Sequence, residues 1–123
     1  MRVLVPGHSD FAAVWYASRR RYDLLLKNGV EVCEWNGSML HAKAVVVDRR
    51  WCSVGSYNLD HRSLLHNLEV NLHVLDDKVA GPLAQRLDDD ISRSRRLTLG
   101  LWRKRPVVEK AAERVFYLFR YLF

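Results

Sequence analysis

A histidine and a lysine stand two residues apart in a stretch whose other residues are typical of a buried strand. The stretch is HAKAVVVD, residues 41–48. Because side chains alternate across a strand, His41 and Lys43 project from one face and can reach one ligand, whereas Asp48 projects from the other. An imidazole can attack phosphorus while an ammonium holds a phosphate oxygen, so this pair suits phosphoryl transfer.

A second strand is expected to complete the group. Residues 51–58 read WCSVGSYN, and pairing of a strand over 51–56 with the first would let Ser56 and Asn58 approach the histidine end from the side. Their hydroxyl and amide could hold further phosphate oxygens. The sequence shows no HxH, no HExxH and no carboxylate cluster nearby, so we expect no metal and no cofactor. The alternative is a hydrogen-bonded core histidine beside a lysine that extends to the surface.

The rest of the sequence predicts an α/β fold in which a mixed β-sheet is flanked by helices. Strands are expected over 2–6, 30–35, 41–48, 51–56 and 69–75. Helices are expected over 9–27, 59–66, 82–96 and 106–123. Ser9-Asp10 can cap the first helix, and Asn28-Gly29 can end it. The predicted order is typical of the α/β class: a strand, a helix and a strand, then a hairpin, a further strand and covering helices.

The 123 residues are expected to form one catalytic domain, 1–101, followed by a C-terminal helix within 102–123. This last segment carries six Lys or Arg against two Asp or Glu. Its apolar residues form a helical stripe, and the charged residues mostly off that stripe are Lys110, Glu113, Arg114 and Arg120. A basic amphipathic helix suits the surface of an anionic bilayer; the alternative is that it docks on the sheet or on a missing half of the protein. No apolar run approaches the ~18 residues that span a bilayer.

The pattern HxKx4Dx6GSxN, residues 41–58, resembles the HKD motif of the phospholipase D superfamily. The match continues with NLDHRS at 58–63 and NLE at 67–69. PGHSD at 6–10, SML before the histidine, and Trp102 before Pro106 resemble the C-terminal half of bacterial cardiolipin synthases. The resemblance covers essentially the whole chain and implies a phospholipase D-like half that contains one HKD motif.

The resemblance also implies a role for each polar residue of the group. His41 would be the nucleophile and would form a phosphohistidine, while Lys43, Ser56 and Asn58 would bind phosphate oxygens. Glu69 would accept a hydrogen bond from the other imidazole nitrogen and so fix its tautomer, as the carboxylate of a catalytic triad does.

Asp48 completes the catalytic motif, and its place on the opposite strand face fits the anchoring of the following turn. Members of the superfamily need two HxK motifs, one histidine attacking and the other acting as general acid. The other four histidines do not begin a second motif: His8, His61, His66 and His73. We therefore expect the second HKD half to come from a missing N-terminal region or from another subunit, and the chain alone to be nearly inert.

The expected function is phosphatidyl transfer between two phosphatidylglycerol molecules, as in cardiolipin synthases. The expected partners are this anionic phospholipid and a membrane surface, with nucleic acid a weaker candidate. The expected location is peripheral, on the cytoplasmic face of the bacterial inner membrane. Two alternatives remain: a homodimeric phosphodiesterase or nuclease with one motif per subunit, and an inactive, truncated, membrane-associated fragment.

Overall fold

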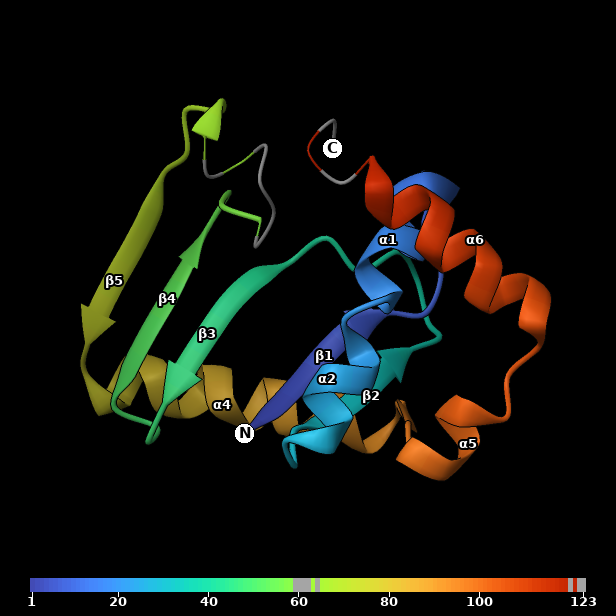
Figure 1. Ribbon diagram of the computed structural model, residues 1–123. Coiled ribbons are helices and arrows are strands. Elements are labelled where there is room, and N and C mark those ends of the chain that lie inside the picture. Colours follow the sequence, from blue (N-terminus) through green and yellow to red (C-terminus); the bar gives the residue numbers. More distant parts are fainter. Residues whose placement is uncertain (59–62, 64, 120, 122–123) are drawn as a thin grey trace. The chain divides into compact units, whose positions relative to one another are not determined.

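The strands form two three-stranded sheets, one in each of the two units into which the chain divides (Figure 1). The computed structural model describes residues 1–58, 63, 65–119 and 121. The first unit contains residues 1–40 and 93–123, and the second contains residues 41–92. The structure confirms the α/β class, but it places the strands in two separate ladders where the sequence predicts one mixed sheet.

The sheet of the first unit has a parallel and an antiparallel pair. β1 (Arg2–Pro6) runs parallel to β2 (Glu31–Trp35), and β2 runs antiparallel to the short β6 (Arg95–Arg96). A parallel pair needs a long crossover connection, which the two helices between β1 and β2 supply. β2 is the middle strand, and its Val32, Cys33 and Glu34 are buried.

The single helix predicted over 9–27 is divided in the structure. α1 (Ala12–Arg19) and α2 (Tyr22–Lys27) are separated at Arg20 and Arg21. Both Arg19 and Tyr22 are buried, and both contact the ring of Trp102, while Arg19 also pairs with Glu34. The predicted stop is confirmed, because Gly29 adopts a φ of 74° just after the helix ends.

The first helix also begins later than its predicted cap. Ser9 Oγ accepts a hydrogen bond from the backbone N–H of Phe11 at 3.2 Å, and Phe11 rather than Ser9 or Asp10 occupies the N-cap position. The serine therefore organises the turn before the helix rather than capping it.

Two helices follow β6 in the first unit. α5 (Leu99–Arg103) buries Trp102, whose ring lies 5.2 Å from that of Tyr22 between centroids. α6 (Val107–Leu118) packs along α1, with the rings of Tyr16 and Phe116 stacked at 5.7 Å. The helix predicted over 106–123 is thus confirmed up to residue 118. In the structure α6 packs with the N-terminal elements of the first unit, and the expected division into a domain over 1–101 and a segment over 102–123 stays a prediction.

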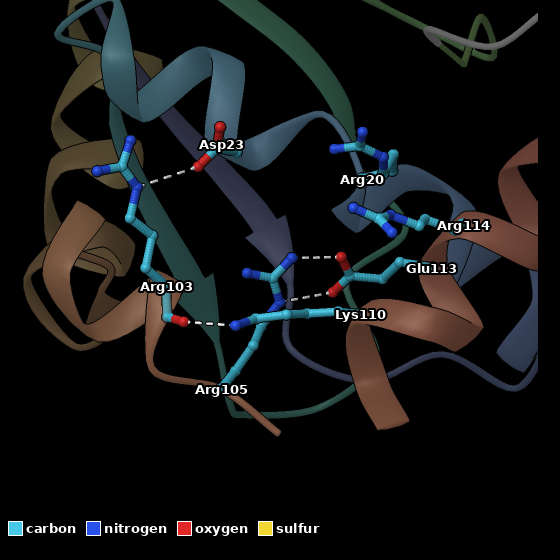
Figure 2. A pocket seen from close by; sticks show the side chains of 7 residues that line it. All are labelled: Arg20, Asp23, Arg103, Arg105, Lys110, Glu113 and Arg114. Carbon is cyan, nitrogen blue, oxygen red and sulfur yellow. Dashed lines mark hydrogen bonds and ion pairs between the residues drawn. The ribbon is translucent and has the colours of Figure 1, made fainter. Parts of the chain in front are cut away.

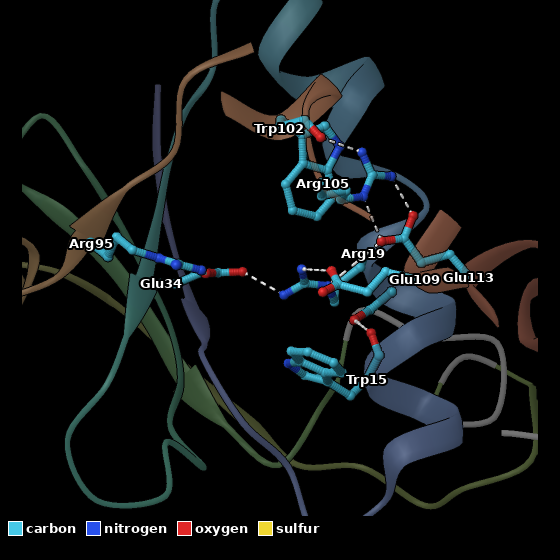
Figure 3. A network of polar contacts seen from close by, with 9 residues as sticks. Trp15, Arg19, Glu34, Arg95, Trp102, Arg105, Glu109 and Glu113 are labelled. Carbon is cyan, nitrogen blue, oxygen red and sulfur yellow. Dashed lines mark hydrogen bonds and ion pairs between the residues drawn. The ribbon is translucent and has the colours of Figure 1, made fainter. Parts of the chain in front are cut away.

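Buried charges also attach α6 to its unit (Figure 3). Glu113 is fully buried, and Arg105 binds it through two hydrogen bonds of 2.5 and 2.9 Å. Arg19 Nε lies 3.7 Å from the same carboxylate, and Arg19 also donates to Glu34 of β2 at 2.8 Å. The sequence placed Glu113 off the packing face; the structure corrects this, because a glutamate can be buried where arginines neutralise it.

The guanidinium of Arg19 is sandwiched between two indoles. Its carbon Cζ lies 4.1 Å from the ring centroid of Trp15 and 4.8 Å from that of Trp102. Aromatic faces stabilise a desolvated cation, so the rings compensate part of the hydration that Arg19 loses on burial. The network thereby joins α1, β2, α5 and α6 around one buried cation.

The second unit is an antiparallel sheet covered on one face by a helix. β3 (Lys43–Val47) pairs with β4 (Trp51–Gly55), and β4 pairs with β5 (Asn71–Leu75). α4 (Asp77–Ser92) contacts all three strands and buries Ala80 and Ala84. Cys52 is buried in the middle of the sheet. These strands confirm the predictions at 41–48, 51–56 and 69–75 in their central parts. Each is shorter than predicted, so His41 comes just before β3 and Ser56 just after β4.

The prediction that α4 begins at Pro82 and ends at residue 96 is wrong at both ends. The helix begins at Asp77, where the side chain of Asp76 accepts a hydrogen bond from the N–H of Lys78 at 2.8 Å. Pro82 lies inside it, and Arg95 pairs with β2 instead of continuing the helix. The helix predicted near 59–66 falls mainly on residues 59–62 and 64, outside the described residues. No helix in the described ranges is long and apolar enough to cross a membrane.

Candidate active site

The candidate catalytic residues all belong to the second unit, and all of them except Asp48 lie near one end of its sheet. The register pairs Lys43 with Gly55, which brings Ser56 to the end of β3 where His41 lies. Gly55 allows this close pairing, because a Cβ at that position would collide with the carbonyl oxygen of Val70 and with Asn71. The glycine of the motif is therefore required by the approach of β5.

His41 and Lys43 contact each other directly. Lys43 Nζ lies 2.6 Å from His41 Nε2 and donates to the backbone oxygen of His41 at 3.1 Å. His41 is exposed and Lys43 is half-buried. The prediction that these two side chains project together is confirmed by this contact.

Glu69, just before β5, is held by neighbours on both oxygens. Ser56 Oγ donates to Oε2 at 2.5 Å, and Asn67 donates to Oε1 at 3.2 Å. The N–H of Val70 in turn donates to Ser56 Oγ at 3.0 Å. The hydrogen bond from Ser56 is the main cause that lowers the pKa of Glu69 below its usual value of 4.5, and the positive charge of Lys43 contributes.

One of the expected contacts differs in this structure, and two of the expected roles are not tested by it. The described contacts of His41 do not include the predicted hydrogen bond from its ring to Glu69, and the carboxylate binds Ser56 and Asn67 instead. Asn58 is half-buried in the segment that leaves β4. The orienting role of Glu69 and the phosphate-binding roles of Ser56 and Asn58 therefore stay predictions.

Asp48 lies at the opposite end of β3 from His41. It and Arg49 have φ of 52° and 55°, and the N–H of Arg50 donates to the oxygen of Val47 at 3.1 Å. Positive φ at both central residues is what a type I′ turn requires, and aspartate tolerates it better than most residues. This position fits the turn-forming role inferred for Asp48.

Arg49 attaches that turn to α4 through an ion pair of 2.5 Å with Asp88. The sequence offered no signal for this pair, because the two residues are 39 positions apart. Sequence reasoning also quoted Asn67 without giving it a role, and the structure shows that it positions Glu69. Among the described residues, no three His, Cys, Asp or Glu side chains form a group that could hold a metal ion.

The fold of the chain is that of the phospholipase D family. It is similar to the crystal structure of Nuc, a phospholipase D family member from Salmonella typhimurium, with a TM-score of 0.68 and 16% identity over 79% of this chain and 63% of that one. The model of the family described as "Cardiolipin synthase, PLD-like domain" matches residues 1–91. The chain therefore belongs to this family, as its HKD motif predicts.

Curated relatives give the same assignment. The chain is 43% identical over 117 residues to cardiolipin synthase A of Yersinia pseudotuberculosis serotype O:3, and 44% identical over 117 residues to that of Escherichia coli O157:H7. Each alignment covers 95% of this chain but 24% of the relative. The chain thus spans about a quarter of the length of these relatives.

Proposed function

We propose that the chain supplies one of the two catalytic halves of a phospholipase D-type phosphatidyltransferase that makes cardiolipin. The observation that carries the proposal is the 2.6 Å contact between His41 Nε2 and Lys43 Nζ at an open strand end. A phosphate oxygen bound to the ammonium at this end would bring phosphorus next to a nucleophilic ring nitrogen. The similarity to cardiolipin synthase A supports the choice of substrate.

In the first step, His41 Nε2 attacks the phosphorus of one phosphatidylglycerol. The nitrogen–phosphorus bond forms, the bond to the glycerol oxygen breaks, and a histidine of the second HKD half donates the proton with which glycerol leaves. Lys43, Ser56 and Asn58 hold the non-bridging oxygens as charge develops. Glu69, with its lowered pKa, remains an anion that stabilises the positively charged ring.

In the second step, the hydroxyl of another phosphatidylglycerol attacks the phosphohistidine. The nitrogen–phosphorus bond breaks, the hydroxyl proton passes to the histidine of the second half, and cardiolipin is released. Water in place of the alcohol would give hydrolysis through the same intermediate. The single HxK motif in this sequence also favours a second candidate, in which two copies supply one motif each and cleave another phosphodiester.

The proposed location is peripheral, on the cytoplasmic face of the inner membrane. α6 leaves Val107, Val108, Val115 and Leu118 exposed. The segment 102–123 has a surplus of basic residues, which suits an anionic surface. The exposed apolar side chains can enter the interface while Arg19, Arg105 and Glu113 hold the helix to its unit.

A chimaera tests the function. The corresponding quarter of E. coli cardiolipin synthase A is replaced by this chain, and cardiolipin and glycerol are measured with phosphatidylglycerol vesicles. We expect both products, and their loss on His41→Asn. A folded chimaera without activity contradicts the proposed transfer. Light scattering and diesterase assays on the isolated chain test the second candidate, which predicts an active dimer.

A further inference from the structure

A cavity of about 200 Å³ in the first unit is lined mostly by basic side chains (Figure 2). The five cations come from the α1–α2 junction and from α5, α6 and their connection: Arg20, Arg103, Arg105, Lys110 and Arg114. Two carboxylates, Asp23 and Glu113, also line it. The wall therefore has an excess of three positive charges, and none of its residues belongs to the unit that contains the candidate catalytic group.

The two carboxylates are already engaged by other cations. Glu113 accepts two hydrogen bonds from Arg105 and also faces Arg19. Asp23 pairs with Lys27 at 2.5 Å, and the hydrogen bond from Lys27 is the main cause that lowers the pKa of Asp23. Asp23 also lies 3.7 Å from Arg103 on the wall. Each carboxylate thus compensates a cation outside the cavity as well as one on its wall.

Arg20 and Arg114 are the cations left over. Within the described part of the chain, no carboxylate pairs with either guanidinium, whereas Lys110 donates to the backbone oxygen of Arg103 at 2.6 Å. Figure 2 shows the two guanidinium groups close together at one side of the cavity. Two like charges in this position repel each other, and an anion between them would turn the repulsion into attraction.

We propose that this cavity binds the phosphate group of an anionic phospholipid. Guanidinium groups form paired, charge-assisted hydrogen bonds with phosphate oxygens, so Arg20 and Arg114 can hold one phosphate from two sides. A volume of about 200 Å³ is many times the ~10–15 Å³ of the same measure that one water molecule needs, which leaves room for a phosphate and part of a headgroup.

The helix that carries Arg114 points to a lipid as the source of the phosphate. Val107 and Leu118 lie seven residues before and four after Arg114, so helical periodicity places all three on one side of α6. These two apolar side chains are 77% and 71% exposed. A phospholipid whose phosphate occupies the cavity would therefore meet apolar side chains beside it, as a soluble phosphate would not.

The test uses the whole chain and vesicles of phosphatidylglycerol mixed with phosphatidylcholine, with flotation as the readout. The double variant Arg20→Gln/Arg114→Gln removes the unpaired cations. The matched control Arg50→Gln/Arg93→Gln removes the same charge from two exposed positions away from the cavity, one in the second unit and one directly after that unit ends at Ser92. We expect affinity to fall at least about tenfold in the first variant and less than about twofold in the control. The wild type and all variants should bind only weakly to vesicles of pure phosphatidylcholine.

Inorganic phosphate distinguishes the two sources of the group. At millimolar concentration it should displace the wild-type chain from the vesicles only partly, because it lacks the apolar contacts. Phosphate binding that depends on Arg20 and Arg114 without vesicle binding would overturn the lipid assignment. Equal losses in the two double variants would show diffuse attraction and overturn the site, as would no loss in either.

Folding is checked by circular dichroism, and Arg20→Lys/Arg114→Lys provides a second variant that keeps the charge. Its affinity for the vesicles should lie between that of the wild type and that of the glutamine variant, because lysine keeps the charge but lacks the paired donors. The readout is binding and needs no turnover, so this proposal and the proposed transferase activity can fail separately.

Discussion

The Nε2 atom of His41 lies 2.6 Å from the Nζ atom of Lys43, at the end of the hairpin where Ser56 binds Glu69. An anion that reaches this end meets a cation and a nucleophilic nitrogen together. The carboxylate of Glu69 is close enough for the charge of Lys43 to act on it. The arrangement suits a two-step transfer in which a nitrogen–phosphorus bond forms and then breaks. The protein contributes by orienting the reacting groups and by stabilising the charge that develops.

Lys43 is expected to stabilise the transition state more than it binds substrate. In the chimaera, Lys43→Gln should lower kcat by about 10²–10³, as loss of a donor to a developing oxyanion does. Lys78→Gln, an exposed position in α4, is the control and should leave kcat unchanged. A change in KM alone would contradict the assigned role.

Glu69 should make stability depend on acidic pH. Its pKa is lowered in the folded chain, so its contribution is present above the usual value of 4.5 and is lost as pH falls through the lowered folded value. The difference in unfolding free energy between the wild type and Glu69→Gln should therefore be largest near neutrality and shrink below pH 4.5. Urea denaturation at several pH values measures it, with the exposed Asp10→Asn as control.

The same variant tests the predicted orienting role of Glu69. If the carboxylate orients and stabilises the ring of His41 during reaction, Glu69→Gln in the chimaera should lower kcat by on the order of 10²–10⁴. A variant with full activity would restrict Glu69 to its structural contacts with Ser56 and Asn67.

Glu113 should be essential for the stability of the first unit. Glu113→Gln removes the charge that compensates Arg105 and Arg19 in a buried site, and we expect a loss of about 3–5 kcal/mol. Glu109→Gln on the same helix is the matched control. Its carboxylate is 35% exposed and 3.4 Å from Arg19, so its loss should cost less than about 1 kcal/mol. Equal effects in urea denaturation would contradict the central place of Glu113.

The candidate site could be predicted from sequence because its signals are local. The alternation of side chains along 41–48 predicted that His41 and Lys43 lie together, and they are in contact. The spacing from Lys43 to Ser56 predicted that Ser56 lies at the same end of the hairpin, and the register places it there. The packing of α6 could not be predicted in this way. Glu113 is buried because Arg19, 94 positions earlier, and Arg105 neutralise it, and helical periodicity counts a glutamate as exposed.

The nucleophilic role of His41 is tested most directly by trapping its covalent intermediate on the isolated chain. Bis(p-nitrophenyl) phosphate is suitable because p-nitrophenolate leaves with the bonding electrons and needs no proton from a second histidine. The bond from Nε2 to phosphorus forms as the aryl oxygen departs. Mass spectrometry at neutral pH then locates the phosphoryl group, with His66→Asn as the exposed control. We predict one adduct per chain on His41, absent in His41→Asn and retained in His66→Asn. An adduct on another residue, or phenolate release that His41→Asn leaves unchanged, would contradict the account.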